Sequence, residues 1–244
     1  MHDSLFSAKR IDMIKLKMYN ILLCKRKKNN IKQRASPINT RFPDKFPAAR
    51  LCERELARMK IFIASDIHGS AFYCKKMLEA YHRECADKLL LLGDILYHGP
   101  RNDLPEGYNP REVCAMLNAV AGDILCVRGN CDSEVDQMVL EFPIMADYCL
   151  VCSGDLAVFA THGHVYNTSS LPPLGAVNIL LHGHTHIPVC EQHENFVYMN
   201  PGSVSLPKEG SNHGYMIAEN GVFEWKTLDG TVYRRYPLPD GDDQ

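Results

Sequence analysis

The 244-residue sequence lacks any apolar stretch long enough to cross a bilayer, which takes about 20 consecutive apolar residues. Its longest apolar run near the start, residues 18–24, is short and flanked by lysines, and no small-residue cleavage site follows it closely. These absences argue against a membrane-spanning helix and against a secretory signal peptide. We therefore expect a cytoplasmic protein with no membrane partner.

A disulfide framework is also missing, although the chain has ten cysteines. They are scattered through apolar segments without paired spacing, and in a reducing compartment such thiols act as small hydrophobic side chains. Cys149 and Cys152 have the CxxC spacing of zinc half-sites and redox motifs. No second CxxC accompanies them, and on a strand, positions three apart face opposite sides. We interpret this pair as structural.

Acidic residues are scarce at the start: residues 1–58 carry 15 lysines and arginines against 5 acidic residues, whereas residues 59–244 carry 12 against 24. The first segment has several prolines and no sustained helical or strand period, so we expect an extension without a fixed fold before a domain over residues 59–244. It is either a basic arm for nucleic acid or a membrane surface, a poor transit peptide, or sequence upstream of the true start. We favour the last interpretation, because Met59 opens directly on a buried strand.

After Met59, apolar strands alternate with helical stretches. Residues 60–64, 88–92 and 124–127 read as buried strands, residues 71–85 have helical spacing, and a second helix begins at Pro110. The rest of the chain is a series of short strands joined by turns, predicted at residues 148–152, 156–161, 178–182, 189–191, 197–199, 214–218 and 222–228. We predict a layered α/β protein whose core lies between two mixed sheets.

Seven polar residues occupy five short blocks, each just past the carboxyl end of a predicted strand. They are Asp66, His68, Asp94, Asn130, His162, His184 and His186. Aspartate, asparagine and histidine are costly to bury without partners, so core packing does not explain this series. Because open α/β sheets place their ligand sites at the carboxyl ends of strands, we expect these side chains to converge.

The chemistry of these residues suits two neighbouring divalent cations. Asp66 and His68 lie two apart in an extended turn, so a carboxylate and an imidazole can reach one cation, as Mn²⁺, Fe and Zn²⁺ prefer. Asp94 can offer one carboxylate oxygen to each of two metals. Two cations roughly 3.5 to 4 Å apart hold a hydroxide at neutral pH and neutralise a phosphoryl group under in-line attack. The sequence therefore predicts phosphoester hydrolysis through a metal-bridging hydroxide.

Two further histidines, His164 and His182, lie two residues from predicted ligands. Periodicity alone does not separate them from the ligand set. We interpret them as neighbours that orient the ligands or line the site.

The series Asp-x-His, Gly-Asp, Gly-Asn-x-Asp, His and Gly-His-x-His resembles the calcineurin-like metallophosphoesterase superfamily. Within that superfamily, residues 59–207 resemble the bacterial YfcE-type phosphodiesterases. The segments that carry this closer likeness are residues 65–70, 98–102, 104–108, 128–138 and 200–205. The resemblance does not cover residues 1–58.

This resemblance implies a four-layer αββα sandwich and a phosphoric diester hydrolase that acts on small phosphodiesters. It implies two divalent metal ions, with Mn²⁺ first and Zn²⁺, Fe or Ni²⁺ as alternatives. One metal would be held by Asp66, His68, Asp94 and His186. The other would be held by Asp94, Asn130, His162 and His184.

One departure concerns Cys131, which stands where many superfamily members have a histidine that stabilises or protonates the reacting phosphate. A thiol is a weak hydrogen-bond donor and a poor general acid for an alkoxide. We therefore predict a modest rate and a preference for diesters with good leaving groups. Its neighbour Asp132 either orients ligands or caps a helix that begins near Ser133. The candidate catalytic set is completed by Asn130, His164 and Arg101.

A long loop, residues 97–110, follows the Asp94 block. Long loops at strand ends often bind substrate. Arg101 can contact a phosphate, and Tyr97 or Tyr108 can stack on an aromatic leaving group. In the alternative interpretation the prolines only shape a lid and Arg101 is solvated. Arg128 is a further candidate, unless it only pairs with an acidic neighbour.

The alternative function is a non-catalytic protein-binding scaffold of the same fold. The retromer coat subunit of eukaryotes resembles this superfamily but has lost ligands, whereas all seven are present here. We do not expect the folded domain to bind nucleic acid, because its acidic balance repels a polyanion. The expected partner is a small phosphodiester substrate, and assembly into a homo-oligomer stays an open alternative.

Overall fold

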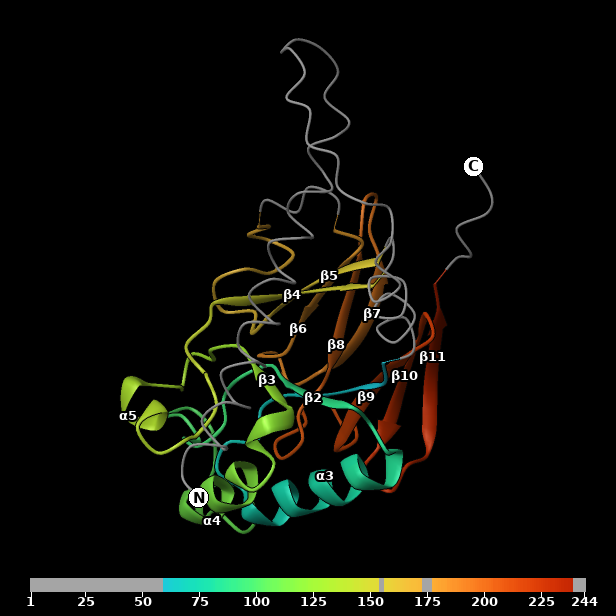
Figure 1. Ribbon diagram of the computed structural model, residues 1–244. Helices are drawn as coiled ribbons and strands as arrows, with labels where there is room; N and C mark the ends of the chain where they lie inside the picture. Colours follow the sequence, from blue (N-terminus) through green and yellow to red (C-terminus); the bar gives the residue numbers. More distant parts are fainter. Residues whose placement is uncertain (1–58, 154–155, 173–176, 239–244) are drawn as a thin grey trace, which may run out of the picture. The chain divides into compact units, whose positions relative to one another are not determined.

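The computed structural model describes residues 59–153, 156–172 and 177–238, and these contain two β-sheets and a layer of helices (Figure 1). The first sheet has the order β11 (Val232–Pro237), β10 (Val222–Thr227), β9 (Gly214–Glu219), β1 (Ile61–Ala64), β2 (Lys88–Leu91) and β3 (Ile124–Cys126). The second has the order β4 (Tyr148–Ser153), β5 (Leu156–Thr161), β6 (Ile179–His182), β8 (Val197–Pro201) and β7 (Pro188–Gln192). The predicted extension over residues 1–58 lies outside the described residues.

Strand β1 is buried on both faces because each face of its sheet is covered. It pairs in parallel with β2 and antiparallel with β9. Phe62 and Ala64 face the helical layer, whereas Ile61 and Ile63 face the second sheet. A strand covered on both sides reads as a continuous apolar run, and the sequence Ile-Phe-Ile-Ala meets that requirement.

Two helices cover the outer face of the first sheet (Figure 1). Helix α3 (Ala71–Glu84) begins where the Ser70 hydroxyl accepts a hydrogen bond from the Tyr73 amide, and it ends at Cys85 in the left-handed conformation. Helix α4 (Pro110–Asn118) has proline at its first position, where no amide donor is needed. A 3-10 turn, η2 (Ala121–Asp123), then leads into β3, and the short helix α5 (Glu134–Gln137) follows β3.

The main core lies between the two sheets. Its largest side chain, Trp225 of β10, is fully buried, and its Nε1 donates a 2.7 Å hydrogen bond to the Asn200 carbonyl of β8. A smaller apolar cluster lies on the other face of the second sheet, where Phe159, Leu180 and Tyr198 pack with residues of loops and strands. The predicted α/β sandwich of two mixed sheets is confirmed. Of the two helical layers in the four-layer αββα arrangement, the described residues contain the one on the first sheet, formed by α3 and α4, while the cluster on the outer face of the second sheet includes no described helix.

Sequence reasoning missed one strand, β11. It pairs antiparallel with β10 across a register shift between Trp225 and Lys226. Its residues are mostly exposed, and the sequence Val-Tyr-Arg-Arg-Tyr-Pro has neither alternation nor an apolar run. The periodicity of burial therefore gave no signal for an edge strand. In the described residues Cys149 and Cys152 are free thiols, and no helix combines the length and apolarity that a membrane crossing needs.

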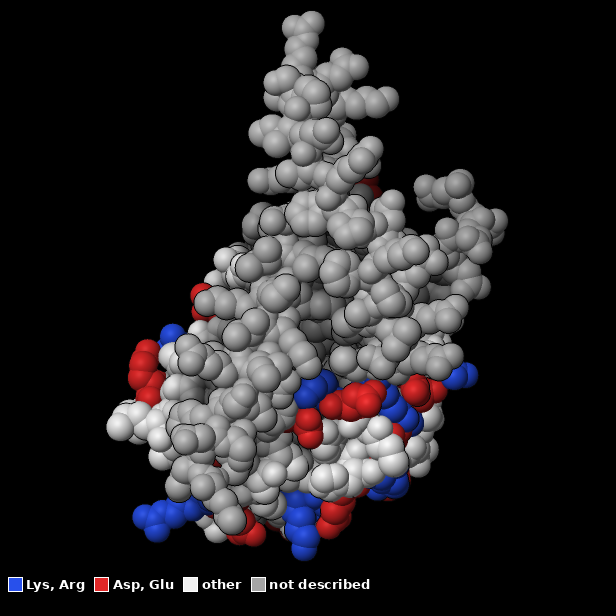
Figure 2. Space-filling view, viewed as in Figure 1, with Lys and Arg blue, Asp and Glu red and all other residues white. Residues whose placement is uncertain are grey.

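Charges of both signs are interspersed on the described surface. Figure 2 shows lysines and arginines next to aspartates and glutamates on the face in view. A less exposed charged group lies at the amino-terminal end of β1. There the Glu84 carboxylate lies 3.2 Å from Lys60 Nζ and 2.9 Å from Lys226 Nζ, and it accepts a 2.8 Å hydrogen bond from the Tyr215 hydroxyl. We call these four residues the Glu84 cluster.

Candidate metal centre

The seven predicted ligands lie at one edge of the two sheets. Each block follows the carboxyl end of a strand: β1 for Asp66 and His68, β2 for Asp94, β3 for Asn130, β5 for His162, and β6 for His184 and His186. Since β1, β2 and β3 are parallel, as are β5 and β6, their ends meet. The sequence prediction of a convergent polar edge is confirmed.

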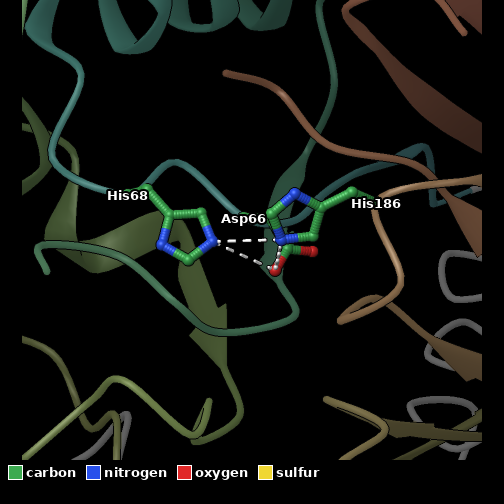
Figure 3. Close-up of side chains that lie close together, drawn as sticks. All are labelled: Asp66, His68 and His186. Atoms are coloured by element: carbon green, nitrogen blue, oxygen red, sulfur yellow. Dashed lines mark hydrogen bonds and ion pairs between the residues drawn. The ribbon is translucent and has the colours of Figure 1, made fainter. Parts of the chain in front are cut away.

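Four of these residues form a first group. His186 Nε2 lies 3.2 Å from the Asp66 carboxylate, and His68 Nε2 lies 3.6 Å from both the Asp66 and Asp94 carboxylates. The two Nε2 atoms of His68 and His186 are 3.2 Å apart. Figure 3 shows both rings directing this nitrogen toward the Asp66 oxygen.

A second group forms around His162. Its Nε2 lies 3.0 Å from Asn130 Oδ1, 3.1 Å from His184 Nδ1 and 3.5 Å from Asp94 Oδ2. Asp94 Oδ2 is also the atom that lies 3.6 Å from His68, so one oxygen faces both groups. The other oxygen, Oδ1, accepts a 2.8 Å hydrogen bond from the Cys131 amide. The expectation that the two Asp94 oxygens serve two metals stays a prediction.

Backbone carbonyls determine which nitrogen of three of these histidines faces inward. Nδ1 of His68 contacts the Tyr97 carbonyl at 2.8 Å, and Nδ1 of His162 and of His186 contact the carbonyls of Leu92 and Leu206, each at 2.7 Å. Because a carbonyl only accepts, each Nδ1 carries a proton, and Nε2 is the nitrogen that presents a lone pair when the ring is neutral, as it is when it binds a cation. Lone pairs directed at one another, and at a buried Asp66 Oδ1 with no hydrogen-bond partner among the described residues, fit a cation site.

The backbone at the site adopts an unfavourable conformation. Among the described residues, eight other than glycine have positive φ, and five of those are predicted ligands. The five are Asp66 (59°), His68 (50°), Asp94 (55°), His184 (68°) and His186 (63°). Side chains other than glycine rarely occupy this region, and such residues concentrate at functional sites.

Two glycines make room for the carboxylates. A Cβ at Gly129 would collide with the Asp94 side chain, and one at Gly183 would collide with Ser65 and lie 2.7 Å from Asp66 Oδ2. Any larger residue would displace a ligand. The glycines within the predicted blocks therefore have a steric reason.

The buried carboxylates make the site electrostatically negative, so a positive charge bound there is stabilised. Burial raises the pKa of Asp66, but the contacts with His186 and His68 outweigh it and hold that pKa well below its usual range. Burial lowers the pKa of His162, yet contact with Asp94 and the charge of Asp66 raise it to about 9. Divalent cations bound by the same atoms would supply this positive charge.

Asp132 positions the Asp94 loop. Its Oδ2 accepts hydrogen bonds from the amides of Asp94 at 2.9 Å and Gly129 at 2.7 Å, and its Oδ1 accepts one from Ile95 at 2.9 Å. The alternative that Asp132 caps a helix is wrong, because the N-cap of α5 is Ser133, which forms a capping box with Asp136. Asp132 therefore acts through Asp94.

Sequence reasoning missed a second group of supporting residues, in residues 200–205. The hydroxyls of Ser203 and Ser205 donate to the Asp66 carbonyl at 2.8 and 3.1 Å. The Asn200 amide donates to the Gly183 carbonyl at 2.9 Å and to the Thr185 hydroxyl at 3.0 Å. The signal available in the sequence was the polar Asn-Pro-Gly-Ser stretch at the end of an apolar strand.

The candidate catalytic residues differ in placement. Cys131 has a ligand-forming atom within 4.8 Å of those of His68 and Asp94, and its Sγ lies 3.2 Å from Asn130 Nδ2. Burial and the Asp94 carboxylate raise the pKa of the Cys131 thiol, so it stays protonated. His164 is exposed, with its ring 5.4 Å from that of His162. His182 is buried and stacks on Tyr198.

The loop of residues 97–110 brings no charged side chain into contact with the ligands. Arg101 is exposed, and no hydrogen bond or ion pair within the described residues involves it. Arg128 donates from Nε to the Asp132 carbonyl at 3.4 Å and lies 3.8 Å from Glu134, so the acidic-neighbour interpretation fits it. The Tyr97 side chain is 43% exposed, while its carbonyl holds His68.

The profile of the calcineurin-like phosphoesterase superfamily domain matches residues 59–221. The chain belongs to this superfamily. Phosphodiesterase YfcE of Escherichia coli is 49% identical over 164 residues, which are 67% of this chain and 89% of that protein. Phosphodiesterase MJ0936 of Methanocaldococcus jannaschii is 27% identical over 151 residues, 59% of this chain and 83% of that protein.

Solved structures agree with this family. The structure of YfcE, a phosphoesterase from E. coli, superposes with a TM-score of 0.70 at 46% identity and covers 73% of this chain and 98% of its own. A structure of Vps29 from Entamoeba histolytica reaches a TM-score of 0.51 at 19% identity, over 74% of this chain and 99% of its own. The second likeness shows the shared fold alone.

Proposed function

We propose that this protein is a dinuclear-metal-dependent phosphodiesterase that hydrolyses small phosphodiesters. The observation that carries the proposal is the pair of ligand groups that share Asp94 Oδ2, with lone pairs directed inward. The superfamily implies divalent cations, and the donor set of carboxylate, amide oxygen and imidazole suits Mn²⁺, Fe, Ni²⁺ and Zn²⁺. Among these, Mn²⁺ is our first expectation.

Each part of the chain has a separable task in this proposal. Asp66, His68, Asp94 and His186 would hold one cation, and Asp94, Asn130, His162 and His184 the other. When bound, such a pair supplies a hydroxide nucleophile and neutralises the phosphoryl charge. The protein fixes the ligands through carbonyls, Asp132 and the residue 200–205 segment, so little reorganisation is needed during the reaction.

Departure of the leaving group is assigned to the Cys131 side of the site. The protonated thiol is a weak donor, so it contributes little to stabilising an alkoxide. A leaving group that is stable as an anion needs no such help. We therefore propose a preference for diesters with good leaving groups.

The test is metal dependence. The full chain is stripped of metal and assayed on bis-p-nitrophenyl phosphate, with and without added Mn²⁺, Zn²⁺, Fe²⁺ or Ni²⁺. We expect turnover only with added metal. If no metal restores turnover, the alternative of a non-catalytic protein-binding scaffold replaces the enzyme.

A further inference from the structure

The connection between β8 and β9, residues 202–213, holds two ligands of the first group. The Ser203 hydroxyl donates to the Asp66 carbonyl at 2.8 Å and accepts from the Leu206 amide at 2.9 Å. The Leu206 carbonyl in turn accepts from His186 Nδ1 at 2.7 Å. One short stretch of chain thus contacts both ligands, so a shift of this connection would move them together.

The outer part of the connection is exposed, and it contacts His186 a second time. The Lys208 amide donates to the His186 carbonyl at 3.2 Å. The Ser211 hydroxyl donates to the Lys208 carbonyl at 2.6 Å and closes a turn. Residues 208–210 and residue 212 are exposed. Because few buried contacts stabilise an exposed segment, its conformation depends on how its end is fixed.

An aromatic stack fixes that end. The rings of His213 and Tyr73 lie 4.0 Å apart between centroids, at an interplanar angle of 10°. Nδ1 of His213 donates to the Val204 carbonyl at 2.9 Å, so the same ring also binds the start of the connection. Tyr73 stands on the first turn of α3 and packs against the core beneath that helix. The stack therefore attaches the connection to a rigid element.

Helix α3 does not depend on this stack. Its first turn is capped by the Ser70 hydroxyl, which accepts from the Tyr73 amide and not from the ring. The Tyr73 hydroxyl is 3.4 Å from the carboxylate of the exposed Glu106, which is a long hydrogen bond. The closest ring contact of Tyr73 is thus with His213, and it serves the connection more than the helix.

The second ligand group has a different support. Nδ1 of His162 donates to the carbonyl of Leu92, a fully buried residue directly after β2. The loop of Asp94 is held by the Asp132 carboxylate. Neither Leu92 nor Asp132 belongs to the β8–β9 connection or to α3. The two groups therefore take their rigidity from separate parts of the chain.

We propose that Tyr73 and His213 are positioning residues that set the metal affinity of the first ligand group and not that of the second. The inference rests on the proposed function, which supplies the two metal positions. His186 Nε2 and Asp66 Oδ1 lie 3.2 Å apart, and both must face one cation. Residues that orient ligands change metal affinity about 10- to 100-fold, and a stack one step further away should give the lower value.

A calorimetric titration of the metal-free full chain with Mn²⁺ tests the proposal. Tyr73→Ala removes the stack and should weaken one of two binding steps about tenfold, with the other changed less than about twofold. His213→Ala removes the same stack from the other side and should give the same selective loss. Tyr73→Phe keeps the stack and should restore the affinity to within about twofold of the wild type. At saturating Mn²⁺ the kcat of all three should recover.

His193→Ala is the matched control. His193 stacks on Phe196 at 4.6 Å and 7°, in the turn that precedes β8, at the end of that strand away from the ligands. Its loss removes an equivalent pair of rings and should change neither step. Urea unfolding in chelator checks that each variant is folded.

Two backgrounds assign the affected step. His162→Ala removes a ligand of the second group and leaves the first, and His186→Ala does the reverse. Adding Tyr73→Ala should weaken Mn²⁺ binding about tenfold in the first background and less than about twofold in the second. Equal effects in the two backgrounds, or no effect in either, would overturn the positioning role.

Hydrolysis separates the two proposals. If the wild type binds two Mn²⁺ ions and Tyr73→Ala weakens one alone, but no diester is hydrolysed, the positioning role stands and the enzyme is overturned. If bis-p-nitrophenyl phosphate is hydrolysed with Mn²⁺ while Tyr73→Ala weakens both steps equally or neither, the enzyme stands and the positioning role is overturned.

Discussion

The two ends of β1 both bury charged side chains, but they balance those charges differently. At the amino-terminal end the Glu84 carboxylate is surrounded by two lysines and the Tyr215 hydroxyl, so charges and hydrogen bonds are satisfied within the chain. At the carboxyl end Asp66 Oδ1 has no hydrogen-bond partner among the described residues, and imidazole lone pairs face one another. Only the second end adopts a series of positive φ angles.

This difference separates stability from function. A self-balanced cluster holds its elements together, here α3, β10 and the start of β1. A cluster with unsatisfied acceptors and strained backbone lowers the stability of the fold until a ligand binds to it, as is common at binding sites. Substitutions at the carboxyl end of β1 should therefore lower activity without lowering stability, and substitutions at the amino-terminal end should do the reverse.

The largest expected effect is that of Asp94→Ala. Since Asp94 Oδ2 faces both ligand groups, its loss should disable both, and metal-dependent hydrolysis should fall by about a thousandfold or more, roughly 4 kcal/mol of barrier. In chelator the melting temperature should stay equal to or above that of the wild type. Glu79→Ala, an exposed carboxylate on α3, is the control. Full activity in Asp94→Ala would contradict the assignment of the metal-dependent activity to the carboxyl end of β1.

Asp132→Asn should come next and should act through metal affinity. The amide group keeps the volume but cannot accept all three hydrogen bonds from the Asp94 loop. We expect Mn²⁺ affinity to weaken about 10- to 100-fold, with kcat largely recovered at saturating metal. A calorimetric Mn²⁺ titration measures this. A lower kcat that added metal does not restore would assign Asp132 a direct part in the reaction.

At the other end of β1, Glu84→Gln should lower the free energy of unfolding by about 2 kcal/mol and leave kcat/KM unchanged. Burial raises the pKa of Glu84, but Lys226, Tyr215 and Lys60 outweigh it and hold that pKa below its ordinary value of 4.5. A carboxylate whose pKa is lower in the folded state than in the unfolded state stabilises the fold at pH values above its unfolded-state pKa. This stabilisation is lost as the pH falls through the folded-state pKa.

The difference in free energy of unfolding between wild type and Glu84→Gln should therefore be present at neutral pH and shrink below about pH 4. Urea unfolding at a series of pH values measures it, with Glu79→Gln as control. A difference that persists at low pH would mean that packing, and not the charge, stabilises this end.

Cys131→His should have the smallest effect and should refine the description of the site itself. An imidazole donates more effectively than a thiol, so we expect about a tenfold rise in hydrolysis of diesters with poor leaving groups and less change for p-nitrophenyl esters. Steady-state kinetics on alkyl and p-nitrophenyl diesters measure the ratio. An unchanged ratio would remove Cys131 from the leaving-group side.

The sequence predicted the candidate metal ligands, but it did not predict the residues that hold those ligands in place. The ligands were predictable because their blocks follow apolar strands whose ends must meet. Asn200, Ser203 and Ser205 were not, because their partners lie on other strands and hydrogen-bond geometry appears only after folding. For the same reason the sequence did not tell which Asp94 oxygen is shared. Strand β11 was not predicted because an exposed edge strand need not alternate apolar and polar residues.

The position of Trp225 has a practical consequence. It is the only tryptophan in the chain, fully buried between the sheets, and its indole N–H is bonded to the carbonyl of the residue that holds the Gly183–Thr185 turn. Selective excitation of this one fluorophore would therefore report on the closure of the two sheets and on the seating of that turn in a single emission signal, without any label.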